Sequence, residues 1–226
     1  MNAFKKIPIT YSGSLHDIRI VNFFVDMDEV KQRVPEQICI RSFGGRAMIS
    51  LVNVMLRNMR PQFLPQGLGF DYRHIAFRLL VDDAPLNNGT AKGLYFLDSF
   101  TDNPFAATAG SLFTDYRLGR AQINAIDNML ELQQGNRYLN YALDFHGEPV
   151  FTEQQKLTGQ LDRAYAVLED ELRMTKICRT QWPLKPTTCY LFETNFFETA
   201  TFAAAFRITE KIDYQWMSPQ TIARCA

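Results

Sequence analysis

Two stretches of this sequence alternate apolar and polar residues with a period of two, and this alternation limits the fold more than any other feature. In residues 74–81, "HIAFRLLV", the odd-numbered positions are all apolar, whereas the even-numbered positions include His74 and Arg78. Residues 206–216, "FRITEKIDYQW", carry apolar side chains at most even-numbered positions. Successive side chains of a β-strand point to opposite faces, so both stretches predict strands.

Further strands are predicted from composition and turn residues. Residues 93–100, "GLYFLDSF", and 136–145, "NRYLNYALDF", are rich in aromatic residues, and the turn "QQGN" supplies the glycine that a hairpin needs before the second segment. Residues 45–59, "GRAMISLVNVMLRNM", also fit a helical stripe, and periodicity alone leaves both interpretations open.

Helices are predicted to be short and few. Residues 26–35, "DMDEVKQRVP", offer an Asp cap, an acidic first turn and a terminating proline, and residues 101–113 place Pro104 near a helix start. Residues 152–172 fit one long helix by spacing. We expect instead a short helix to about Arg163 and then a hairpin turning at "EDE", because "LRMTKICRTQW" is typical of a strand.

Eight or more strands with few helices favour a mainly β fold, a closed or strongly curved antiparallel barrel without exposed edges. The chain has 226 residues, of which 46% are hydrophobic, and it contains no linker-like tract. Residues 1–226 are therefore expected to form a single domain.

Charge and composition argue against several classes of protein. Lys plus Arg and Asp plus Glu both total 24, so no basic surface is expected to bind nucleic acid. No secretory or membrane-spanning segment is evident, which predicts a cytoplasmic protein with no membrane partner. The four cysteines and three histidines are too dispersed for a metal motif, so we expect no metal and no cofactor.

Two longer segments resemble acetoacetate decarboxylases. Residues 25–40, "VDMDEVKQRVPEQICI", are similar to the helix-and-strand segment of that family, and residues 93–119 are similar in order and spacing to its strand, acidic turn, small-residue helix and reactive loop. The segment "TQWPLKP", residues 180–186, is closer to a poorly characterised bacterial family of the same fold. The resemblance implies a β-barrel with a central apolar cavity, makes residues 45–58 a strand, and favours a homo-oligomer.

The resemblance also implies a lysine pair just before Leu118 and Gly119, where this chain has Tyr116 and Arg117. A Schiff-base nucleophile must be an amine, so Tyr116 cannot form an imine. We therefore do not expect a Schiff-base decarboxylase, and Lys92 and Lys156 are the nearest substitute amines in the sequence.

The matched positions give a set of ligand-binding candidates but no assigned catalytic residue. His16 falls where the family has a cavity arginine, and His74 lies near the position of its acid. If His74 and Arg78 face the cavity, Ile75, Phe77, Leu79 and Val81 pack outward, although a solvent-facing polar surface would show the same alternation. The candidates for contact with a small-molecule ligand are Tyr116, Arg117, His74, Arg78 and His16.

The same residues allow simpler interpretations. Tyr116 can close the end of the barrel with its ring buried and its hydroxyl in contact with water. Arg117 can pair with a surface carboxylate, and Asp98 and Asp102 can accept hydrogen bonds within turns. Two functions remain open. One is a protein that binds a small apolar carboxylate or ketone without covalent chemistry; the other is an enzyme using general acid-base catalysis on a keto or enol substrate.

Overall fold

Strands make up most of the computed structural model, which describes residues 8–113, 118–146 and 154–224. One set of strands closes into a barrel, because β1 pairs with β14 on one edge and with β3 on the other. In order around the barrel, the strands are β3 (Arg46–Pro61), β4 (Phe70–Val81), β5 (Gly93–Thr101), β10 (Arg163–Leu168), β11 (Glu171–Arg179), β14 (Ile212–Trp216) and β1 (Tyr11–Asp26). The mainly β barrel expected from the sequence is confirmed.

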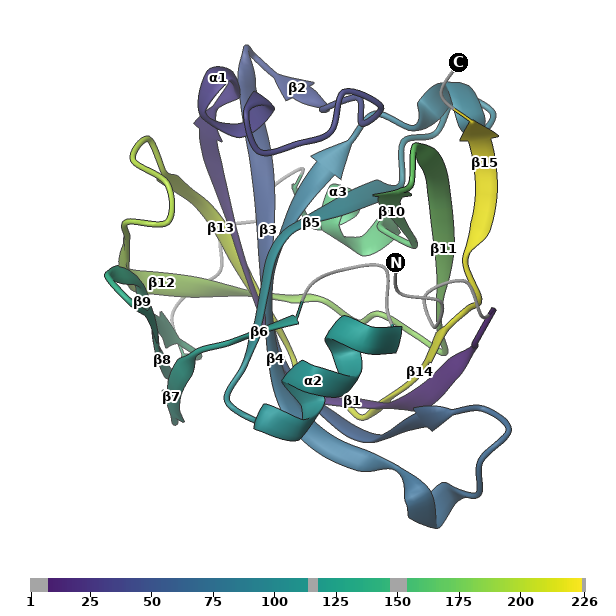
Figure 1. The fold of residues 1–226 in the computed structure, drawn as a ribbon. Helices are drawn as coiled ribbons and strands as arrows, with labels where there is room; N and C mark the ends of the chain where they lie inside the picture. The colour runs from purple at the N-terminus through teal and green to yellow at the C-terminus, as the bar shows by residue number, and fades with distance from the viewer. Residues whose placement is uncertain (1–7, 114–117, 147–153, 225–226) are drawn as a thin grey trace.

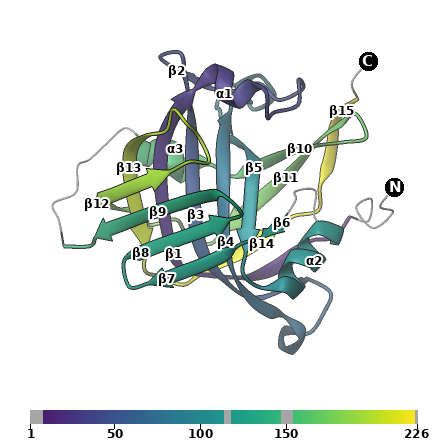
Figure 2. The ribbon, with the colours of Figure 1, turned by 60° about the vertical axis from the view of Figure 1, so that its left-hand side comes forward.

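A second sheet covers the outside of the barrel and appears in Figure 2 as a layer in front of β1, β3 and β4. It connects to the barrel through β13, which pairs with β1 on one side and β12 on the other. The strands of this sheet are β13 (Thr201–Ile208), β12 (Lys185–Thr194), β9 (Arg137–Asp144), β8 (Met129–Gln134) and β7 (Gln122–Ile126).

The remaining elements are short. Helix α2 lies in front of the barrel in Figure 1, whereas Leu157 of α3 packs against the apolar cluster on the inner face. These elements are the strands β2 (Ser42–Phe43), β6 (Leu118–Arg120) and β15 (Gln220–Arg224), the helices α1 (Met27–Lys31), α2 (Pro104–Phe113) and α3 (Gln154–Gln160), and the 3-10 turns Gln66–Leu68 and Ala84–Leu86. No helix in the described ranges is long and apolar enough to cross a lipid bilayer.

Most of the predicted elements are confirmed. Residues 46–61 form a strand rather than a helix, and the segment from 154 forms a short helix followed by a hairpin that turns at Glu169 and Asp170. Gly135 has φ +59° in the β8–β9 hairpin, a left-handed conformation that glycine adopts without steric cost. The hairpin predicted from the glycine of "QQGN" is therefore confirmed.

The run of residues 206–216 was expected to be one strand and is instead two. The pairing with β1 continues across the break, since Ile208 lies opposite Ile18 and Ile212 lies opposite Leu15. At this point β1 itself has a register shift between His16 and Arg19 in its pairing with β3. The break separates two roles, because β13 continues into the second sheet while β14 pairs with β11 in the barrel.

The main apolar core lies between the barrel and the second sheet. Phe23 of β1 and Phe77 of β4 meet edge to face with ring centroids 6.3 Å apart, and Phe197 lies 5.7 Å from both rings. Ile75, Phe77 and Leu79 all belong to this cluster, so these side chains of β4 point away from the barrel interior, as expected. Val81 packs in a smaller cluster with Ile38 and Tyr165.

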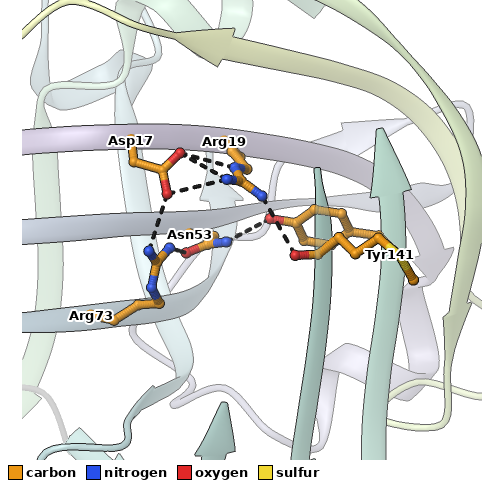
Figure 3. A network of polar contacts seen from close by, with 6 residues as sticks. Asp17, Arg19, Asn53, Arg73 and Tyr141 are labelled. Carbon is orange, nitrogen blue, oxygen red and sulfur yellow. Dashed lines mark hydrogen bonds and ion pairs between the residues drawn. The ribbon is translucent and has the colours of Figure 1, made fainter. Parts of the chain in front are cut away.

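A polar network crosses the same interface. Figure 3 shows Asp17 and Arg19 of β1, Asn53 of β3 and Arg73 of β4 meeting Tyr141, which reaches over from β9. Arg73 Nη1 donates to Asn53 Oδ1 at 2.7 Å, and Asn53 Nδ2 donates to the Tyr141 hydroxyl at 2.8 Å. Since Asn53 is fully buried, its amide has no access to water as an alternative partner.

We expect Tyr141→Phe to lower the free energy of unfolding by about 1 to 3 kcal/mol, because it leaves a buried Asn53 donor unsatisfied. Chemical denaturation monitored by circular dichroism measures the change. The control is Tyr138→Phe, on the same strand, whose side chain is 40% exposed. Equal stability of the two variants would contradict the importance of this network.

Candidate ligand-binding site

The barrel encloses a cavity of about 380 Å³. Its wall is built from the inner faces of β1, β3, β4, β5, β11 and β14, and Phe105 and Ala106 of α2 also line it. Most of the lining is apolar, a composition typical of pockets for small organic molecules. The chemistry of the cavity therefore depends on the few polar side chains that reach it.

Strand alternation places His74 and Arg78 on the inner face of β4, where both line the cavity. They are only 7% and 6% exposed, so the alternative of a solvent-facing polar surface is wrong for this strand. A register shift between Phe77 and Arg78 interrupts the pairing of β4 with β5 and brings Arg78 opposite Phe96. The inner face of β4 thus carries a base and a cation into an apolar space.

Ser50 of β3 holds the Arg78 guanidinium in place. Arg78 Nε donates to the Ser50 carbonyl oxygen at 3.1 Å, and Nη2 donates to Ser50 Oγ at 2.9 Å. Ser50 lies directly opposite Arg78 in the β3–β4 ladder and is fully buried. These bonds occupy one edge of the guanidinium, while Nη1 makes no hydrogen bond with the part of the chain that the structure describes.

Arg179, from the end of β11, is a second cation in the wall of the cavity. Its guanidinium lies 4.2 Å from the ring centroid of Trp182, and Nη2 donates to the Leu161 carbonyl oxygen. No Asp or Glu occurs among the described residues lining the cavity, although Asp162 influences Arg179 electrostatically. Two guanidinium groups therefore face an apolar space whose described lining contains no carboxylate.

Burial perturbs the titration of these groups. Desolvation, and then the charge of Arg179, lowers the pKa of Arg78 to about 9. Desolvation, followed by the charge of Arg78, lowers the pKa of His74 to about 3. At neutral pH the cavity accordingly holds a neutral imidazole and cations that cost free energy to bury.

The other candidates from the sequence lie elsewhere. His16 is not among the described residues that line the cavity, and its Nε2 is 2.9 Å from Ser14 Oγ. The charges that act on it are those of Arg57, Lys211, Asp71 and Asp213. Tyr116 and Arg117 fall outside the described residues. The structure thus brings His74 and Arg78 into one cavity and does not bring His16 to it.

Asp98 is also not the turn residue that the sequence suggested. It lies within β5, where its Oδ2 accepts from Arg33 Nη2 at 2.6 Å and from Arg137 Nη1 at 3.3 Å. These ion pairs join Asp98 to arginines from the segment after α1 and from β9, and no local sequence pattern indicates that these three residues meet. Asp102 follows the end of β5 and is exposed.

Several cavity residues were missed by sequence reasoning. Arg179, Trp182, Tyr214 and Trp216 all line the cavity. Tyr214 and Trp216 occupy the even-numbered, mostly apolar positions of the alternating run 206–216, and this pattern indicated that they share one face of the strand. The alternation alone does not tell which face of the strand points into the barrel. Nothing local in the sequence marks Arg179, whose position depends on closure of the barrel.

Comparison with known proteins assigns the chain to a family. The model of DUF2071, described as an "Uncharacterized conserved protein", matches residues 13–221. The chain belongs to the DUF2071 family. The comparison with curated proteins gives no match.

Solved structures similar to this DUF2071 protein have the acetoacetate-decarboxylase-like fold. An acetoacetate decarboxylase-like enzyme from Sphingomonas wittichii RW1 is 9% identical with a TM-score of 0.62, and covers 97% of this chain and 95% of its own. Acetoacetate decarboxylase from Legionella pneumophila is 12% identical with a TM-score of 0.63, over 95% and 87% of the two chains.

The enduracididine biosynthesis enzyme MppR, solved in complex with pyruvate, is 9% identical with a TM-score of 0.64, over 96% of this chain and 92% of its own. At such low identities these similarities establish the fold alone. The family resemblance seen in the sequence is confirmed at that level.

We expect the pKa of His74 to make stability depend on pH. The folded-state pKa of about 3 lies below the ordinary value of 6.5, so the unfolded chain binds a proton first and stability is lost as pH falls between these values. From pH 7.5 to 4.5 this group alone should cost about 2 to 3 kcal/mol.

Denaturation of His74→Gln and His146→Gln at both pH values tests this expectation. The exposed His146 provides the matched control. His74→Gln should lose less stability on acidification than either the parent or His146→Gln, and parallel losses in all three proteins would contradict the assignment.

Proposed function

We propose that this protein binds a small apolar carboxylate in the barrel cavity, without forming a covalent bond to it. The observation that carries the proposal is Arg78, a 6% exposed guanidinium facing an apolar cavity whose described lining includes no acidic side chain. A buried charge is stable only when it is paired, and an anionic ligand would supply the missing partner. A ketone oxygen could accept from the same donors, with less charge compensation.

The hydrogen bonds of Arg78 indicate how a carboxylate would bind. Ser50 accepts from Nε and from one N–H of Nη2, so Nη1 and the second N–H of Nη2 are available to a ligand. Together they can donate two roughly parallel N–H bonds to a carboxylate, the strongest pairing available to arginine. Arg179 would add a second positive charge from the opposite wall, which favours an anion over a neutral ligand.

A solved structure of similar fold also supports the proposal. MppR was solved in complex with pyruvate, a small carboxylate, and this structure superposes with a TM-score of 0.64. At least one protein of this fold therefore binds such an anion.

An enzyme that uses His74 as a general acid or base is the second candidate. The observation in its favour is that the imidazole lines the same cavity as Arg78. Its pKa of about 3 makes it a weak base. Efficient proton transfer near neutral pH requires a pKa closer to the working pH, so binding is the better supported of the two functions.

Ligand titrations with Arg78 variants test the proposal. Both tryptophans of the chain line the cavity, so their fluorescence reports on occupancy. We expect hexanoate to bind more tightly than hexan-1-ol, and Arg78→Met to weaken hexanoate binding by about 2 to 4 kcal/mol, or roughly 30- to 700-fold. Arg57→Met, which removes an exposed charge from β3, provides the control.

Thermal unfolding of the same variants without ligand checks their integrity. Because no described carboxylate pairs with Arg78, removing this buried cation should leave the stability of Arg78→Met unchanged or raised. Hexanoate binding of equal strength in Arg78→Met and the parent protein would refute the proposal.

Borohydride reduction in the presence of acetoacetate tests the non-covalent part. Because the matched position is Tyr116, which has no amine, we expect the intact mass to remain unchanged. A lysine adduct retained after reduction would return the protein to Schiff-base chemistry.

A further inference from the structure

The cavity has a continuous series of aromatic rings along one wall. Phe70, Tyr72 and His74 alternate along the inner face of β4, and all three line the cavity. Phe70 and Tyr72 are stacked with ring centroids 5.5 Å apart, and the next separation, from Tyr72 to His74, is 6.3 Å. Strand alternation alone thus produces a row of flat side chains.

This row extends in both directions beyond β4. At the cavity mouth Phe105 of α2, 65% exposed, meets Phe70 edge to face at 5.3 Å. Deeper in the barrel Phe96 of β5 stacks on His74 at 6.3 Å and lies 5.8 Å from Trp216, which is 9% exposed. Neighbouring rings therefore lead from the protein surface to the buried part of the cavity.

The series of rings ends beside the Arg78 cation. Arg78 and Phe96 are direct partners in the β4–β5 ladder, and both line the cavity. Cross-strand partners have Cβ atoms about 5 Å apart on the same face of a sheet. A molecule whose carboxylate contacts Arg78 would need only a short spacer to place a ring against Phe96.

We propose that the ligand of this cavity is an aromatic carboxylate, with its carboxylate at Arg78 and its ring on the series Phe70–Tyr72–His74–Phe96. This inference rests on the proposed function, since it names the class of the anion. Aromatic pairs are stabilised beyond the burial of their area by quadrupole interactions, an advantage that a saturated ring lacks. A cavity of about 380 Å³ lies at the small end of ligand pockets, in accord with a single ring and a short chain.

Isothermal titration calorimetry with three related probes tests the inference. The probes are 3-phenylpropanoate, 3-cyclohexylpropanoate and 3-phenylpropan-1-ol. The cyclohexyl acid has more apolar surface than the phenyl acid, so the hydrophobic effect alone favours its binding. Tighter binding of the phenyl acid would therefore require a specific preference for an aromatic ring. We expect the phenyl acid to bind about 3- to 10-fold more tightly than the cyclohexyl acid, and the alcohol to bind most weakly.

Variants then locate the preference. Phe96→Leu keeps an apolar side chain but removes the ring, and should bring the two acids to similar affinity. Phe70→Leu, nearer the mouth, should reduce the preference in the same direction. Phe202→Leu is the matched control, because Phe202 is on β13 and does not belong to the cavity lining.

The outcomes separate the two proposals. Equal affinities of the two acids, or tighter binding of the cyclohexyl acid, with both dependent on Arg78, would overturn the aromatic inference while leaving carboxylate binding intact. Binding of neither acid, or binding of the alcohol as tightly as the acids, would overturn the proposed function together with this inference.

Discussion

The structure depends on the burial of both faces of its central strands. β1, β3 and β4 each have one face against the barrel interior and one against the second sheet, so most of their side chains are excluded from water. Closure by the β1–β3 ladder gives these strands an inner face, and the second sheet packs on their outer face (Figure 2). Every buried polar residue on these strands must therefore be paired within the protein or bind a ligand.

Buried polar residues are satisfied differently at the interface between the two sheets and in the cavity. Between the sheets, Asn53, Tyr141, Arg73 and Asp17 satisfy one another in a connected network, and the acid Asp17 compensates its arginine partners. In the cavity, Arg78 has the carbonyl and hydroxyl oxygens of Ser50 as hydrogen-bond partners. These neutral acceptors bind Nε and Nη2 of Arg78 but do not neutralise its charge. This contrast distinguishes a polar network that stabilises the fold from a charge positioned for function.

Sequence periodicity predicted the division of β4 into two faces, and the glycine of "QQGN" predicted the hairpin at Gly135. The hairpin at Asp170 was predicted because the segment after it is typical of a strand. The local sequence pattern did not indicate which strands would become neighbours in the barrel. The run of residues 206–216 was taken as one strand although Glu210 interrupts its apolar parity; this residue lies at the break and pairs with Lys185. His16 was matched by counting back along the chain, but β1 shifts register just after it, between His16 and Arg19. Arg179 and Trp182 reach the cavity only because β11 joins the barrel far along the sequence.

The partition of β4 also has a consequence for how such a protein can change over time. Its even-numbered inner positions, including 70, 72, 74 and 78, determine the shape and charge of the cavity, whereas 75, 77 and 79 hold the second sheet. Substitutions in these two sets act on separate packing environments, although they alternate along a single strand. Mutations at every second codon can therefore change ligand preference, while the codons between them keep the residues that pack against the second sheet. Ligand recognition and folding are thus encoded on one strand but can be selected independently.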